Sequence, residues 1–101
     1  MNKLIKQVEK WSMDKNLHEA DSSKQFLKVT EEIGEVAAAL ARNHMDDLKD
    51  GIGDVVVTLI ILAQQNGMTL EECLSQAYGE IQHRKGDLVD GVFVKQEDLR
   101  K

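Results

Sequence analysis

Hydrophobic residues recur every three or four positions along most of the chain, which is the spacing of amphipathic helices. One such segment covers about Asn2 to Lys15, and a second runs from Lys24 to about Asn43. The polar stretch between them lacks this period, and its Ser22 and Gln25 have the S-x-x-Q spacing of a capping box. The pattern therefore predicts a helix, a loop that ends at this capping box, and a second helix.

A third segment is apolar on almost all sides between Val55 and Ala63. We expect it to form a helix that is buried on more than one side, because an ordinary surface helix keeps one polar face. Asp46 or Asp47 is expected to cap the beginning of this helix. The pair Asn66–Gly67 is expected to end it, since both residues tolerate the left-handed backbone conformation that follows many helices.

The last third of the chain predicts one more helix and a tail. Thr69 and Glu72 have the spacing of a second capping box, so a fourth helix is expected to begin there and to end near Gly86. Cys73 lies on the apolar stripe of this helix and is expected to be a core residue. The remaining residues, Asp87–Lys101, are expected to form an extended tail that lies on another element.

Composition favours an all-α fold. The chain has no proline and only 4% aromatic residues, and residues that favour helices are abundant. With 101 residues it is expected to form a single domain that spans residues 1–101. A domain of this length buries only about 60 to 70% of its surface, so four helices packed alone are marginal. We therefore expect self-association into a homodimer or a homotetramer.

Charge and hydropathy exclude several classes of protein. The chain has 13 Lys and Arg against 18 Asp and Glu, for a net charge of −5, and it has no basic run that could bind polymeric nucleic acid. No apolar run reaches the roughly 20 residues of a membrane span, and the N-terminus lacks a signal-peptide pattern. These features predict a cytoplasmic protein without a membrane partner. A phosphorylated small molecule fits this acidic chain only if a cation lies between them.

Two acidic groups lie next to apolar stripes of the predicted helices. They are Glu31, Glu32 and Glu35 on the second helix, and Asp47, Asp50 and Asp54 on the third. Each group shares one helix face, so several carboxylates converge and repel one another. Two facing helices of this kind offer the oxygen ligands that Mg²⁺ and Mn²⁺ prefer.

Glycines accompany both acidic groups, although glycine in a helix interior costs about 1 kcal/mol relative to alanine. Gly34 lies within the first group, and Gly51 and Gly53 lie within the second. This placement indicates a close approach of the two helices at the acidic residues. Acidic helix faces are more often simply solvated, so these patterns by themselves leave open both a metal site and an ordinary surface.

Two sequence motifs resemble a known family. EEIGEVAAAL, followed by DGIGDVVVTLIILA, is similar to the E-E-x-x-E and E-x-x-D signature of the MazG-like nucleoside triphosphate pyrophosphohydrolases, an all-α superfamily. The ending HRKGDLVDGVFVKQEDL, Trp11 and Gln25 also look like short members of this family, so the resemblance covers nearly the whole chain. It implies a four-helix MazG-like bundle that is completed by oligomerisation and has a short extended C-terminal tail.

The resemblance also implies an activity and a set of site residues. Members cleave NTPs or dNTPs between the α and β phosphates, which yields a monophosphate and pyrophosphate with the help of Mg²⁺, for which Mn²⁺ can substitute. The implied catalytic residues are Glu31, Glu32 and Glu35, and the implied metal ligands are Glu32, Glu35, Asp50 and Asp54. The chain departs from the family pattern at Gly51, where a glutamate is expected, and Asp50 is the nearest carboxylate.

Four further residues are candidates for binding the nucleotide. Trp11 and Gln25 are candidates for contacts with the base, and Arg84 and Lys85 are candidates for contacts with the phosphates. Each also has a structural alternative, since Trp11 fits a core position, Gln25 a helix cap, and the two cations a helix end. The alternative for the whole protein is a non-catalytic helical module that oligomerises or binds a partner through Val55–Ala63.

Overall fold

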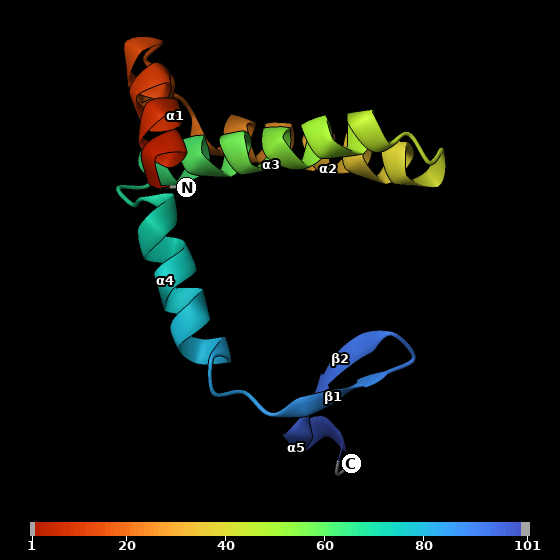
Figure 1. Cartoon of the computed structure of the whole chain (residues 1–101). Coiled ribbons are helices and arrows are strands. Elements are labelled where there is room, and N and C mark those ends of the chain that lie inside the picture. Colours follow the sequence, from red (N-terminus) through yellow and green to blue (C-terminus); the bar gives the residue numbers. More distant parts are fainter. Residues whose placement is uncertain (1, 100–101) are drawn as a thin grey trace. The chain divides into compact units, whose positions relative to one another are not determined.

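The structure is a computed structural model that describes residues 2–99 (Figure 1). Its elements are α1 (Asn2–Asp14), a short 3₁₀ helix η1 (Leu17–Glu19), α2 (Ser22–Ala41), α3 (Met45–Gln65), α4 (Leu70–Ile81), β1 (Gly86–Val89), β2 (Val92–Lys95) and α5 (Gln96–Leu99). The mostly helical fold is confirmed. The chain forms two compact units, of which the first ends at Glu71 and the second begins at Glu72.

The first unit is built on the long helices α2 and α3. These helices lie side by side in opposite directions, joined by a short turn in which Asn43 has a left-handed φ of 57° (Figure 1). Helix α1 and η1 pack against α3. The buried apolar residues come from α1, α2 and α3; they are Ile5, Val29, Ala39, Ile60, Ile61 and Ala63.

The expected burial of the third helix is confirmed. Every residue from Val55 to Ala63 is buried or half-buried, because α2 covers one side of α3 while α1 and η1 cover another. Within the described residues, no helix is long and apolar enough to cross a membrane.

The predicted helix caps need correction. Asp21 caps α2, since its carboxylate accepts hydrogen bonds from the backbone N–H groups of Ser23 at 2.7 Å and Lys24 at 3.3 Å. Ser22 is already the first helical residue, so the capping box expected there is not formed. Helix α3 begins after His44, which places Asp46 and Asp47 in its first turn. Their negative charges there interact favourably with the helix dipole, but their side chains do not cap the helix.

The expectation of close helix contact at the glycines holds at one position. A methyl group on Gly51 would lie 3.0 Å from Cγ2 of Val36, which is tighter than almost all real contacts of this kind. Helices α2 and α3 therefore approach closely because position 51 has no side chain. Gly34 and Gly53 face open space, so they do not serve this contact.

The second unit contains a β-hairpin where an extended tail was expected. Strands β1 and β2 pair antiparallel from Gly86↔Lys95 to Val89↔Val92. The two residues between them, Asp90 and Gly91, both have positive φ, as the tightest hairpin turns require. The tail is thus a hairpin whose two strands pair with each other, and not a single extended segment.

Two predictions for the fourth helix also fail. Helix α4 ends at Ile81, and Gly86 instead begins β1, where a side chain would collide with the backbone carbonyl of Val94. Cys73 is exposed, and no residue of α4 is buried. The apolar residues Leu74 and Tyr78 of this helix are exposed as well.

Candidate functional site

Glu32 is the buried member of the acidic residues on α2. Only 8% of its surface is exposed, whereas Glu31 and Glu35 are exposed. Helical geometry explains the difference, because Glu32 follows the buried Val29 by three residues and therefore lies on the same face, toward α3. A carboxylate at the edge of an apolar helix interface is unusual, because burial removes the water that stabilises its charge.

The surroundings of Glu32 do not compensate its charge. Burial raises the pKa of Glu32 above its ordinary value, the negative charge of Glu35 raises it further, and Lys28 partly opposes both. Within the described residues, Oε2 of Glu32 is buried without a hydrogen-bond partner. Glu32 and Glu35 can share one proton, but two ionised carboxylates cannot bond to each other. Glu32 thus presents an acceptor with no donor.

Asp54 is the acidic residue of α3 whose charge interacts with Glu32. It is half-buried, and this burial is the largest cause that raises its pKa. The negative charges of Asp50 and, to a smaller extent, Glu32 raise the pKa further. The effect of Glu32 shows that the acidic residues of the two helices interact across the interface. Electrostatic effects thus link Glu32 with Glu35 on α2 and with Asp54 on α3, and they link Asp54 with Asp50.

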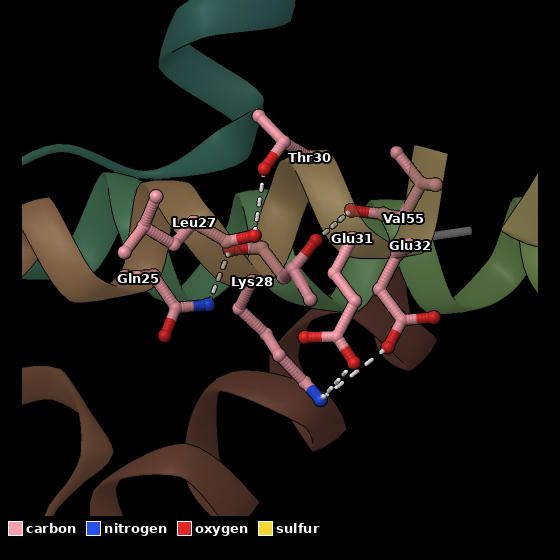
Figure 2. Close-up of polar contacts among 8 residues, drawn as sticks. Gln25, Leu27, Lys28, Thr30, Glu31, Glu32 and Val55 are labelled. Carbon is pink, nitrogen blue, oxygen red and sulfur yellow. Dashed lines mark hydrogen bonds and ion pairs between the residues drawn. The ribbon is translucent and has the colours of Figure 1, made fainter. Parts of the chain in front are cut away.

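Lys28 is a neighbour of this cluster that the sequence analysis did not identify. Its Nζ lies 3.6 Å from Oε1 of Glu31 and 3.7 Å from Oε1 of Glu32, so it lies between the two carboxylates (Figure 2). The signal was present in the sequence, because residues three and four positions apart meet on a helix surface. Lys28 also lowers the pKa of Asp54, so its charge acts on α3 as well.

A cavity of about 260 Å³ lies beside the cluster, between α2, the turn after it, and α3. Its lining residues are Glu35, Ala38, Ala39, Arg42, His44, Asp47, Asp50, Gly51 and Asp54. Asp47 belongs to the wall of this cavity, and its Oδ2 lies 3.5 Å from Nδ1 of His44. Arg42 and His44 were not identified from the sequence, since they lie at the end of the predicted second helix and just after it and belong to no motif.

The described residues contain no group of three or more His, Cys, Asp or Glu side chains placed closely enough to hold a metal ion by themselves. The acidic residues surround the helix interface, and they do not converge on one point. Mg²⁺ tolerates such an arrangement, because it keeps several waters and is usually held by one or two carboxylates together with substrate phosphates. An open carboxylate cluster of this kind suits a metal that is shared with a bound phosphate.

Gln25 and Trp11 occupy different surroundings in the first unit. The side chain of Gln25 donates a hydrogen bond to the carbonyl of Thr58 at 3.0 Å and so joins α2 to α3, which differs from the expected cap (Figure 2). Trp11 is 48% exposed, so it is not the core residue of the structural alternative. It lines an apolar cavity of about 330 Å³ with Leu4, Gln7, Val8 and Val57.

Arg84 and Lys85 lie in the second unit. They line a cavity of about 480 Å³ whose other lining residues are Glu80, His83, Lys95, Gln96 and Glu97. The hairpin register pairs Gly86 with Lys95, and the backbone N–H of Gln96 donates to the carbonyl of Lys85 at 2.8 Å. Lys95 thereby joins the two cations, and sequence reasoning missed it because the hairpin was not predicted.

Comparisons with known proteins identify the family. Residues 21–89 match the MazG nucleotide pyrophosphohydrolase domain, and this range includes every acidic residue of the cluster. The chain is 46% identical over 67 residues to the "Uncharacterized 18.2 kDa protein in rep-hol intergenic region" of Haemophilus phage HP1 (strain HP1c1). The match covers 65% of the chain and 41% of the phage protein, and no solved structure matches significantly. The chain belongs to the MazG nucleotide pyrophosphohydrolase family.

Proposed function

We propose that this protein is a Mg²⁺-dependent pyrophosphohydrolase that splits NTPs or dNTPs into a monophosphate and pyrophosphate, with Mn²⁺ able to replace Mg²⁺. The family supports hydrolysis of nucleotides. The observation that carries the proposal is the buried Glu32, whose Oε2 has no hydrogen-bond partner and whose charge acts on Asp54 across α2 and α3. Nothing in a purely structural helix pair requires this arrangement, because unpaired buried acceptors destabilise a fold.

The charge of the carboxylate cluster favours a divalent cation that is shared with substrate phosphates. Burial and mutual repulsion raise the pKa values of Glu32 and Asp54, and a cation would relieve both effects. Glu32, Glu35, Asp50 and Asp54 are the residues that we propose as ligands. Bound Mg²⁺ supplies positive charge to the phosphate oxygens and makes a bound water more acidic.

The residues of the chain supply the remaining chemistry in this proposal. A carboxylate among Glu31, Glu32 and Glu35 accepts the proton of the attacking water, and the bond between the α phosphorus and its bridging oxygen breaks. Glu31 is exposed, so it can reach a bound substrate more easily than the buried Glu32. Pyrophosphate then leaves with the bridging oxygen.

Each of the two compact units has its own cavity with candidate contacts for a nucleotide. The apolar cavity at Trp11 offers an aromatic face on which a base can stack. Gln25 already donates to Thr58, so a base contact uses its remaining amide atoms. Arg84 and Lys85, together with Lys95, provide the cationic side chains that we assign to the phosphates.

We also propose that the protein works as a homodimer or homotetramer. Large apolar side chains of α2 are exposed, among them Phe26 at 56%, Leu27 at 66% and Leu40 at 62%. Association of copies of the chain would bury such apolar side chains and so remove them from water. The alternative function, a helical module without catalytic activity, was expected to bind a partner through Val55–Ala63, which is buried or half-buried within the chain. Binding of a divalent cation discriminates between the two functions.

The test is release of pyrophosphate from a panel of NTPs and dNTPs in the presence and absence of Mg²⁺. We expect Mg²⁺-dependent release from at least one nucleotide and its near abolition in Glu32→Gln, which keeps the shape and loses the anionic ligand. Asp46→Asn is the matched control, because Asp46 is an exposed carboxylate outside the cluster. No release from any nucleotide, or equal loss in both variants, would contradict the proposal.

A further inference from the structure

Lys28 has an unusual position for a surface lysine. Its ammonium group lies between 3.6 and 3.7 Å from carboxylate oxygens of both Glu31 and Glu32 (Figure 2). The Glu32 side chain is only 11% exposed, so this ion pair is screened by water less than an ordinary surface pair. Lys28 therefore places a positive charge at the edge of the buried part of the cluster.

The charge of Lys28 acts on both helices. Its ammonium group lies 3.7 Å from Oε1 of Glu32 on α2, and its charge also acts on Asp54 of α3. In the metal-free protein the single positive charge of Lys28 thus partly neutralises the residues that we propose as ligands. The Lys28 side chain is 52% exposed, so its ammonium group can turn into solvent without any movement of the helix.

We infer that Lys28 is the resident counter-cation of the carboxylate cluster and that a divalent cation must displace it from Glu32 in order to bind. This inference rests on the proposed metal site. It assigns to Lys28 a role in metal affinity that does not require contact with the substrate. Lys28 therefore acts on the reaction only through the carboxylates that we propose as metal ligands.

Coulomb's law gives the direction of the effect. A divalent cation that approaches Glu32 is repelled by the ammonium group, or else the ammonium group leaves and its two ion pairs are lost. Both alternatives weaken binding of the metal relative to a chain without the charge. Lys28 conversely stabilises the metal-free protein, because without it the carboxylates repel one another with less compensation.

The experiment measures Mn²⁺ binding to the full chain at pH 8 by electron paramagnetic resonance of free Mn²⁺, without nucleotide. Lys28→Met is compared with the parent, with Lys28→Arg, and with Lys24→Met. Lys24 lies one helical turn before Lys28 on α2, and only its backbone contributes to the helix cap. Lys24→Met therefore makes the same change of net charge outside the cluster.

We expect Lys28→Met to bind Mn²⁺ about three- to tenfold more tightly than the parent, from the loss of two partly screened ion pairs. Lys28→Arg and Lys24→Met should stay within twofold of the parent. In thermal melts, Lys28→Met should unfold at a lower temperature than the parent without metal and gain more from added Mn²⁺. This second measurement separates a change of charge from a general loss of structure.

Three results would overturn the inference. Unchanged or weaker binding in Lys28→Met, with normal binding in the parent, refutes the role of Lys28 and leaves the metal site intact. Equal tightening in Lys24→Met shows a general effect of net charge. Absence of Mn²⁺ binding in the parent and in every variant overturns the proposed metal site, and the inference with it.

Discussion

The contact between Gly51 and Val36 allows a quantitative test of how α2 and α3 pack. Alanine at an ordinary helix interior position is more stable than glycine by about 1 kcal/mol. Gly34 and Gly53 face open space, so Gly34→Ala and Gly53→Ala should each gain close to this amount. Gly51→Ala should gain the same propensity but must place its methyl group 3.0 Å from Cγ2 of Val36.

Val36 has little freedom to yield. It is half-buried, and a valine in a helix strongly prefers one rotamer, so the strain must move the helix backbones. Overpacking of this kind costs about 1 to 3 kcal/mol. The net effect of Gly51→Ala is then between zero and a loss of about 2 kcal/mol, opposite in direction to the other two glycines.

Thermal melting of the metal-free variants measures the difference. A change of 1 kcal/mol shifts the melting temperature of a domain of this size by about 4 to 8 °C, so Gly51→Ala is easily separated from the other two variants. Val36→Ala should restore the gain in combination with Gly51→Ala, which a double-mutant cycle detects as coupling. If Gly51→Ala stabilises the protein as much as Gly53→Ala does, then the close approach of the helices at this point is wrong.

Three further predictions concern the carboxylates. Glu32→Gln should melt at a higher temperature than the parent without metal, because it removes a buried repulsive charge. Because the pKa of Glu32 is raised in the folded state, the folded protein binds this proton more tightly than the unfolded chain does. The melting temperature should therefore fall as the pH rises above about 4, the ordinary range of a carboxyl group, and this fall should be smaller in Glu32→Gln. Asp50→Asn should weaken Mn²⁺ binding as much as Asp54→Asn does, as measured by titration calorimetry; an effect confined to Asp54→Asn would show that Asp50 is no ligand.

The helices could be predicted because their apolar residues have a period that only a helix satisfies. The ends were harder to place, since neighbouring residues compete for the same cap. Ser22 had the spacing of a capping box, but Asp21 lies one residue earlier and its carboxylate reaches two backbone N–H groups. The geometry of the loop after η1 decides between them, and sequence spacing does not encode it.

The hairpin was missed although its signal was local. Asp90 and Gly91 stand between Val89 and the alternating Val92–Val94, which is a strong pattern for a two-residue turn. Each strand has only four residues, so the two strands together were interpreted as one extended tail. Missing the hairpin also meant missing Lys95, whose place near Lys85 depends on the strand register.

Within the acidic cluster, spacing grouped the carboxylates but could not rank them. Glu31, Glu32 and Glu35 all lie near the interface, yet only Glu32 is buried. The rotation of α2 about its own axis selects it, and this rotation depends on contacts between the helices, such as that of Val36 with Gly51. Sequence spacing predicts which residues share a helix face, but it does not predict which of them is buried at the interface.

The same contact bears on the departure from the family signature at position 51. A glutamate there would begin at the point where a methyl group already meets Val36, so the present packing of α2 on α3 disfavours it. Asp50 lies on the exposed flank, where a carboxylate costs no packing, and its charge still acts on Asp54. Replacing Gly51 with glutamate alone should therefore destabilise the protein before it adds a ligand. Tighter metal binding is expected only when Val36→Ala makes room for the new side chain.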